Sequence, residues 1–244
     1  MSAAPPRVCR GDDHLLWSVT MTWLPIAVDA LPERDAVLGL KPELYTHLRE
    51  TLAAAWRIVD PRLLDCCRLR MAQMMGARAE LAGADPQLLA ELKQWQSSPA
   101  FSERERVALA YAEQYHLDHT LITDEQKQEL ARHFSRRGAI NFVWALWANE
   151  TYARILTLFD IAPDPPSAGV RPERNPAIDP ADRRDAAINT MSDPDSADMW
   201  ALRDREFSDA HFALGRGAVA QKLIDDVTSE AVRLHNANHQ GCLY

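Results

Sequence analysis

The stretch Asp65–Glu80, DCCRLRMAQMMGARAE, recurs in part near the other end of the sequence as Glu230–Tyr244, EAVRLHNANHQGCLY. Laid side by side, the two stretches share an acid, an Arg-Leu pair, an alanine and a glycine in one register (Asp65/Glu230, Arg68/Arg233, Leu69/Leu234, Ala72/Ala237, Gly76/Gly241). Both read as a helix that runs up to a glycine. The match predicts a short internal repeat.

The C-terminal copy lies in a predicted amphipathic helix. Its apolar residues recur at helical spacing and form one stripe (Val219, Leu223, Val227, Ala231 and Leu234). Glu230 and Cys242 are the two residues of this segment best suited to chemistry.

The sequence between Pro42 and Leu158 also has the pattern of helices. Pro42 suits a first helical turn, and Pro61 opens another helix with Asp60 as its N-cap. A short helix is expected at Pro86–Trp95. Two more begin after Ser102 and Thr123, which form capping boxes with Glu105 and Gln126. A last one is expected at Ala139–Leu158, after a break at Arg136–Gly138. No segment alternates with a period of two over a convincing length, so the sequence predicts an all-α fold.

Composition shifts divide the chain into four parts. Residues 1–30 form an N-terminal arm, and 31–161 form a helical domain. Residues 162–180 hold a run of prolines without an apolar stripe, which is typical of a linker. Residues 181–244 form a helical extension, either a truncated second copy of the domain or a segment that packs on the first domain or on a neighbouring subunit.

Charge and cysteine content narrow the class of protein. The formal net charge of −8 argues against nucleic acid or an anionic membrane as a partner. No apolar run is long enough for a transmembrane helix, and the N-terminus does not resemble a secretory signal. The four cysteines (Cys9, Cys66, Cys67 and Cys242) are irregularly spaced and form no disulfide framework. These features favour a cytoplasmic, reducing location.

The order of acid, spacer, glycine and cysteine in Glu230–Tyr244 resembles the opening of the active-site motif of the carboxymuconolactone decarboxylase family, which includes the alkylhydroperoxidase D-like proteins. That motif continues to a second cysteine three residues after the first and commonly to a histidine. The resemblance extends over Leu31–Ile161 and, in part, Val219–Tyr244. It implies an alkylhydroperoxidase D-like helical bundle that forms a homo-oligomer. The upstream copy is degenerate, because it keeps Asp65 but has Ala77 and Glu80 at the two cysteine positions.

The activity that the family implies is thiol-dependent peroxide reduction of the peroxiredoxin type. Cys242 would be the thiol, Glu230 the acid that tunes it, and a thiol or dithiol the reductant. A peroxidatic thiol reacts as the thiolate, which the N-terminus of a helix favours. Along a straight helix Glu230 and Cys242 would lie roughly 18 Å apart, so the relay requires a turn at Gln240–Gly241 and a returning helix.

The second thiol of the motif would follow Tyr244. Either the C-terminal motif is a relic, or the reading frame is cut short, as would happen if a UGA codon for selenocysteine at the second position were read as a stop.

The competing interpretation is a non-catalytic helical scaffold for oligomerisation or binding. A decarboxylase-type lyase, which needs acid–base groups and no cysteine pair, has no specific support. Neither a cofactor nor a metal site is predicted, because His235 and His239 lack a third ligand. The remaining candidates have ordinary explanations: Cys66 and Cys67 as packed apolar groups, Asp65 and Glu80 as caps or ion-pair partners, and Trp144 and Trp147, near Asn149 and Glu150, as core residues or the wall of a pocket.

Overall fold

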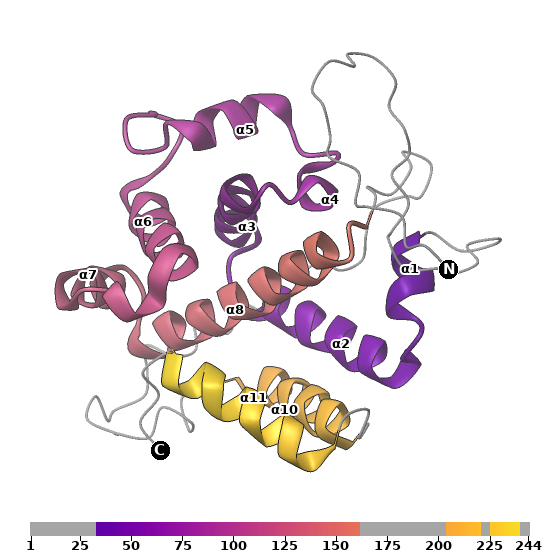
Figure 1. Cartoon of the computed structure of the whole chain (residues 1–244). Coiled ribbons are helices and arrows are strands. Elements are labelled where there is room, and N and C mark those ends of the chain that lie inside the picture. The colour runs from indigo at the N-terminus through magenta and orange to yellow at the C-terminus, as the bar shows by residue number, and fades with distance from the viewer. Residues whose placement is uncertain (1–32, 162–203, 221–224, 240–244) are drawn as a thin grey trace, which may run out of the picture.

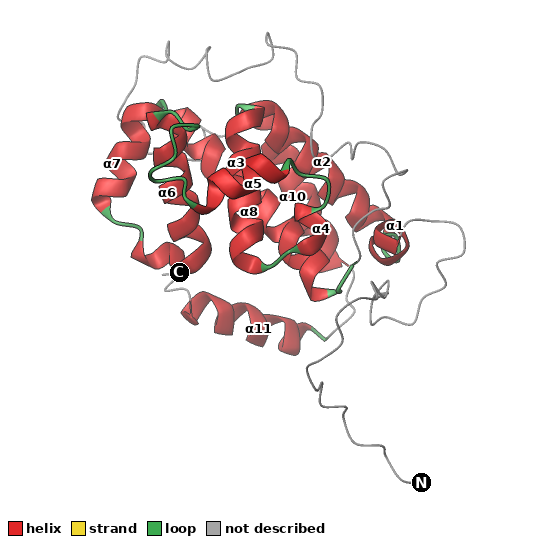
Figure 2. Ribbon diagram, turned by 90° about the horizontal axis from the view of Figure 1, so that it is seen from above, coloured by secondary structure: helices red, strands yellow, loops and turns green. Residues whose placement is uncertain are grey.

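The computed structural model describes residues 33–161, 204–220 and 225–239. In these residues every regular element is a helix, and no strand is present, which confirms the all-α prediction (Figures 1 and 2). The elements are α1 (Glu33–Leu38), α2 (Pro42–Ile58), α3 (Pro61–Met75), α4 (Arg78–Leu81), α5 (Pro86–Lys93), α6 (Glu103–Asp118), the 3₁₀ helix η1 (His119–Leu121), α7 (Asp124–His133), α8 (Arg136–Leu158), α10 (Arg205–Ala220) and α11 (Asp226–His239). The predicted N-terminal arm and proline-rich linker lie outside the described residues.

The predicted helix starts are confirmed where a side chain caps the first turn. Asp60 accepts a hydrogen bond from the backbone N–H of Leu63 at 3.1 Å. Ser102 forms its capping box with Glu105: the Ser102 N–H donates to Glu105 Oε2 at 2.8 Å, and the Glu105 N–H donates to Ser102 Oγ at 3.3 Å. Thr123 begins α7 with the same arrangement. Each cap satisfies backbone donors that a helix start leaves without a partner.

The start of α8 differs from the prediction. The sequence indicated a break at Arg136–Gly138, whereas α8 begins at Arg136. The reason is Ser135, whose Oγ accepts a hydrogen bond from the Gly138 N–H at 3.1 Å and caps the helix one turn earlier. Gly138 is therefore buried within the first turn of α8 and does not interrupt the helix.

The core is built around α8. Helices α2 and α3 both pack against α8, and α6 covers the far side of α3. In Figure 1, α8 crosses the middle of the molecule, with α3 and α6 on one side and α2 with α10 on the other. The largest fully buried side chains come from five of these helices (Trp56, Leu64, Leu109, Phe142, Leu146 and Phe207). Burial of these apolar side chains supplies the main driving force for the fold.

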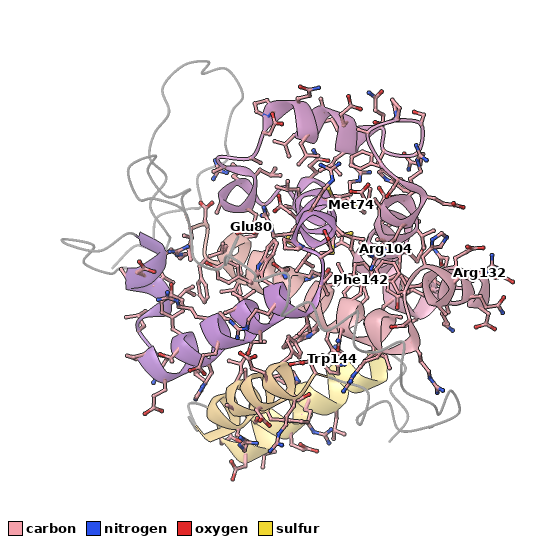
Figure 3. All side chains as sticks on the ribbon, turned by 180° about the vertical axis from the view of Figure 1, so that it is seen from behind. Met74, Glu80, Arg104, Arg132, Phe142 and Trp144 are labelled. Carbon is pink, nitrogen blue, oxygen red and sulfur yellow. The ribbon has the colours of Figure 1, made fainter. Side chains whose placement is uncertain are left out.

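Helix α10 completes this core although it follows the linker. It packs along α2. The Asp204 N–H donates to Asn141 Oδ1 at 3.1 Å, and Phe207 is 1% exposed. The ring of Phe207 lies 6.0 Å from that of Trp144, which Figure 3 places on the side of α8 that faces α10. Part of the predicted extension thus packs on the first domain.

Helix α11 is different, because its side chains from Asp226 to His235 are all exposed. Val227 is 80% exposed and Leu234 53%. Among the residues that the structure describes, no helix is long and apolar enough to cross a membrane.

Candidate functional site

The first copy of the repeat folds as a helix, a tight turn and a second helix. Gly76 ends α3 with φ of 72°, in the left-handed region where a residue without a Cβ is favoured. The Ala77 N–H then donates to the Ala72 carbonyl at 2.9 Å, which is the closing bond of a Schellman motif. Ala77, which the sequence resemblance aligns with the family's first cysteine, is the N-cap residue of the short helix α4.

Glu80, at the position of the second cysteine, is a buried ion-pair partner. Its Oε2 accepts a hydrogen bond from Arg68 Nη1 at 2.7 Å, and its carbonyl accepts one from the same atom at 3.0 Å. Arg68 also donates to Asp65 Oδ1 through Nη2 at 2.6 Å and Nε at 3.0 Å. The Arg68 side chain is 5% exposed and that of Glu80 is 1% exposed. Arg68 therefore joins Asp65 and Glu80 in one cluster.

The charge on Arg68 is held in place by its two partners. Burial acts to lower the pKa of Arg68, but the attraction of Glu80 and Asp65 outweighs burial, and the net pKa lies above its ordinary value. Of the two explanations offered for Asp65 and Glu80, the ion pair is confirmed.

The second copy repeats the acid–arginine pair. Glu230 accepts hydrogen bonds from Arg233 Nη2 at 2.5 Å and Nε at 2.8 Å, with the same three-residue spacing as Asp65 and Arg68. The hydrogen bond from Arg233 lowers the pKa of Glu230. Unlike the first copy, this pair is exposed. Cys242 lies outside the described residues.

The two cysteines on α3 are not suited to thiol chemistry. Cys66 is 1% exposed and Cys67 is fully buried. Burial raises the pKa of Cys66 to about 12 and raises that of Cys67 well above its ordinary value. Because the thiolate is the reactive form, both thiols are inert at neutral pH. The interpretation of this pair as packed apolar groups is confirmed.

A separate cleft of about 640 Å³ lies where the end of α6 and η1 meet α8. Its walls are formed by aromatic, imidazole and polar side chains (Tyr115, His116, Leu117, Asp118, His119, Thr120, Trp147, Glu150, Thr151 and Arg154). Trp147 and Glu150 line the cleft, as one of the two interpretations of this region expected. Trp144 packs on α10 instead, and the Asn149 side chain donates to the Ala145 carbonyl at 2.9 Å.

A histidine, a carboxylate and an arginine are joined in the wall of this cleft. His116 Nδ1 lies 2.7 Å from Glu150 Oε1, and Arg154 Nη2 donates to the same oxygen at 2.8 Å. Burial acts to raise the pKa of Glu150, but the hydrogen bonds from His116 and Arg154 outweigh burial and the net pKa is lowered. Glu150 is thus ionised and only accepts, so the Nδ1 of His116 is the donor of this hydrogen bond.

His116 was not predicted from the sequence as a site residue. Glu150 and Arg154 stand at the i,i+4 spacing of a helical ion pair, which was a usable signal. His116 lies 34 residues before Glu150, on another helix, and no local pattern connects the two. In the part of the chain that the structure describes, no three His, Cys, Asp or Glu side chains are grouped so that they could hold a metal ion.

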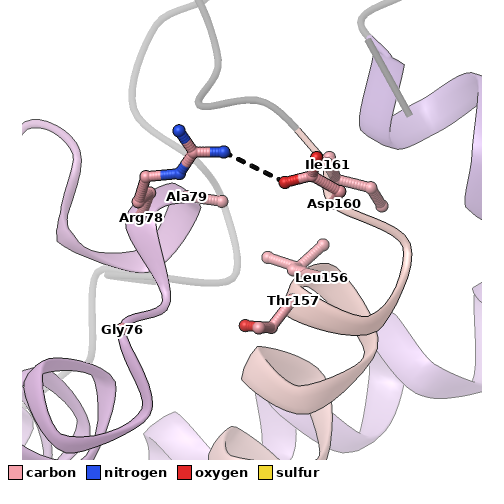
Figure 4. A pocket seen from close by; sticks show the side chains of 7 residues that line it. All are labelled: Gly76, Arg78, Ala79, Leu156, Thr157, Asp160 and Ile161. Carbon is pink, nitrogen blue, oxygen red and sulfur yellow. Dashed lines mark hydrogen bonds and ion pairs between the residues drawn. The ribbon is translucent and has the colours of Figure 1, made fainter. Parts of the chain in front are cut away.

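A second hollow, of about 30 Å³, lies between the α3–α4 turn and the end of α8 (Figure 4). Arg78 Nη2 donates to Asp160 Oδ1 across it at 3.0 Å. A space of this size holds little more than a water molecule. It is too small to be a site for an organic substrate.

No protein-family model matches the chain. The chain is 33% identical over 83 residues to the uncharacterized protein YnjA of Escherichia coli (strain K12). This match covers 34% of the chain and 45% of YnjA, so it spans less than half of either protein. It shows a distant, partial likeness to a protein whose own function is not described.

Proposed function

We propose that the chain is a carboxymuconolactone decarboxylase-like protein that reduces peroxides through a thiol of its C-terminal copy. The observation that carries this proposal is the repeated acid–arginine pair. Asp65 with Arg68 on α3, and Glu230 with Arg233 on α11, form the same three-residue ion pair at matching positions of the two stretches. This agreement supports the internal repeat and, with it, Cys242 as the thiol of the second copy.

The fold of the first copy suggests how the thiol would be activated. There the glycine turn places the next residue, Ala77, at the N-cap of a helix. Cys242 follows Gly241 at the matching position. A thiol at the N-terminus of a helix is stabilised as the thiolate by unpaired N–H groups and by the helix dipole. The thiolate attacks the peroxide O–O bond, releases an alcohol or water, and becomes a sulfenic acid, which a thiol reductant converts to a disulfide and water.

The test is peroxide consumption with dithiothreitol as the reductant. Wild type is compared with Cys242→Ser and Glu230→Gln, and Cys9→Ser is the control for a cysteine outside the motif. We expect Cys242→Ser to abolish the rate above background, Glu230→Gln to lower it, and Cys9→Ser to leave it unchanged. A wild-type rate equal to that of Cys242→Ser would contradict the proposal.

The second candidate function is a non-catalytic helical scaffold. The buried Arg68–Glu80 pair and the inert thiols of Cys66 and Cys67 favour it for residues 33–161, because this part of the chain has no reactive thiol. Equal, near-background rates in the peroxide assay, together with a defined oligomer, would support the scaffold.

We further propose that the chain forms a homo-oligomer in a cytoplasmic setting. The exposed apolar side chains of α11, Val227, Val232 and Leu234, support an association through this helix. Light scattering on the purified chain, and on a variant with Val227→Asp and Leu234→Asp, measures the mass directly. A monomeric wild type would contradict this proposal.

A further inference from the structure

We propose that the cleft between α6, η1 and α8 binds a small aromatic carboxylate, with the carboxylate at Arg154 and the aromatic body beside Trp147 and Tyr115. This site is separate from the thiol chemistry proposed above. Its volume of about 640 Å³ falls within the range of small-molecule sites, which run from roughly 300 to 1,000 Å³.

On the polar side of the cleft, formed by His116, Glu150 and Arg154, some N–H groups of Arg154 are not used by the rest of the described chain. Arg154 donates to Glu150 through Nη2, and within the described residues its Nε and Nη1 have no other hydrogen-bond partner. These remaining N–H groups can receive a carboxylate side by side, which is the geometry that a guanidinium favours. The Arg154 side chain is 57% exposed, so the ligand reaches it without displacing a buried group.

Glu150 fixes the positions of His116 and Arg154 in the wall of the cleft. Its Oε1 accepts from both His116 and Arg154, so its negative charge is shared between two neighbours. Asp118 is the other carboxylate in the cleft, and its Oδ1 accepts from the N–H and the hydroxyl of Thr120 at 2.8 and 2.5 Å. Both acids accept hydrogen bonds from protein donors, and Arg154 is the one Lys or Arg side chain among the residues that line the cleft.

The apolar side of the cleft is formed by aromatic side chains. Trp147 and Tyr115 both line the cleft, and the Tyr115 ring lies 6.4 Å from that of His119. The Trp147 ring packs edge-on against the ring of His211 on α10, with the ring centroids 4.6 Å apart and an interplanar angle of 87°. Planar rings pack on such surfaces with a preference over saturated groups of equal size. Together the two walls select a flat, singly charged acid.

The experiment is titration calorimetry on the full chain with 2-naphthoate as the probe. Its neutral amide, 2-naphthamide, tests the charge, and cyclohexanecarboxylate tests the aromatic ring. The variants are Arg154→Gln and Arg154→Lys, with Arg78→Gln as the matched control, because Arg78 is also an exposed arginine paired with a carboxylate. Thermal melts verify that each variant is folded.

We expect one saturable site per chain for 2-naphthoate, because one cleft holds both walls. Arg154→Gln and the neutral amide should each weaken binding by about tenfold or more, which is the loss of a charge-assisted hydrogen bond. Arg154→Lys should fall between wild type and Arg154→Gln, since lysine keeps the charge but not the planar fork. Arg78→Gln should bind as wild type does.

Three outcomes would overturn the proposal. The first is the absence of saturable heat with up to about 10 mM 2-naphthoate. The others are equal binding by wild type and Arg154→Gln, and equal affinity for 2-naphthoate and cyclohexanecarboxylate.

Discussion

Replacing Arg68 by methionine should destabilise the protein more than any surface charge substitution. The change keeps much of the apolar stem but removes the guanidinium that lies 2.7 Å from the Glu80 carboxylate, whose side chain is 1% exposed. Breaking a buried pair in this way costs about 3–5 kcal/mol. For a chain of this size each kcal/mol lowers Tm by roughly 2–4 °C, so a fall of at least about 6 °C is expected.

The assays are urea denaturation for the free energy of unfolding and a thermal melt for Tm, both followed by far-ultraviolet circular dichroism, with Arg132→Met as the control. Arg132 pairs with Glu129 at 2.5 Å, but its side chain is 64% exposed, and such surface pairs contribute about 0–1 kcal/mol. Figure 3 shows the contrast, with Glu80 in the interior and Arg132 at the edge on α7. Equal losses in Arg68→Met and Arg132→Met would refute the reasoning.

A double variant distinguishes the energetic effect of the ion pair from that of side-chain packing. Arg68→Met combined with Glu80→Leu removes both charges and fills the space with apolar groups. Because a buried ion pair replaced by apolar side chains of similar volume is often neutral, most of the loss from Arg68→Met should be recovered. A double variant that is less stable than Arg68→Met alone would mean that the charges themselves stabilise the fold.

Three further predictions concern caps, thiols and acid. Ser102→Ala should lower the free energy of unfolding by about 1 kcal/mol, measured in urea, because the capping box of α6 is lost. Cys66 and Cys67 should not react with a disulfide reagent until the chain unfolds, which stopped-flow labelling of a Cys9→Ser, Cys242→Ser variant would show. The lowered pKa of Glu150 stabilises the fold above its unfolded pKa of about 4.3, and this contribution is lost as pH falls. Glu150→Gln should therefore flatten the acid limb of a stability–pH profile.

Local signals in the sequence predicted the helices whose first turn is capped by a side chain, but not the short helices α1 and α4. The predicted C-terminal stripe was also partly wrong, because Val219 belongs to α10 and not to α11. Asp60, Ser102 and Thr123 cap the helices that they were expected to begin, because a cap depends on residues within one turn. The start of α8 was placed too late, because a break was expected at Arg136–Gly138 and the capping role of Ser135 was not considered. Ser135 and Gly138 were both visible in the sequence, and the cap stabilised the helix against the glycine.

The candidate sites depend on contacts that no local pattern contains. An acid such as Glu80 is normally exposed, and only the return of α4 beside α3 places it against Arg68. His116 and Glu150 come together because α6 and α8 both border the same cleft. The apolar nature of Cys66 and Cys67, in contrast, could be predicted, because a free cysteine in the middle of a helix is normally a small buried apolar group.

The docking of α10 has a consequence for how the chain is made. Its Glu206 pairs with Arg57, 149 positions earlier, and its Phe207 fills a place in the centre of the protein. During synthesis the ribosome releases α2 and α8 long before α10, so a nascent chain that ends near residue 161 has an uncovered apolar surface along α2. Contacts of such long sequence separation also slow folding. A nascent-chain series should therefore become protease-resistant only after α10 has left the exit tunnel.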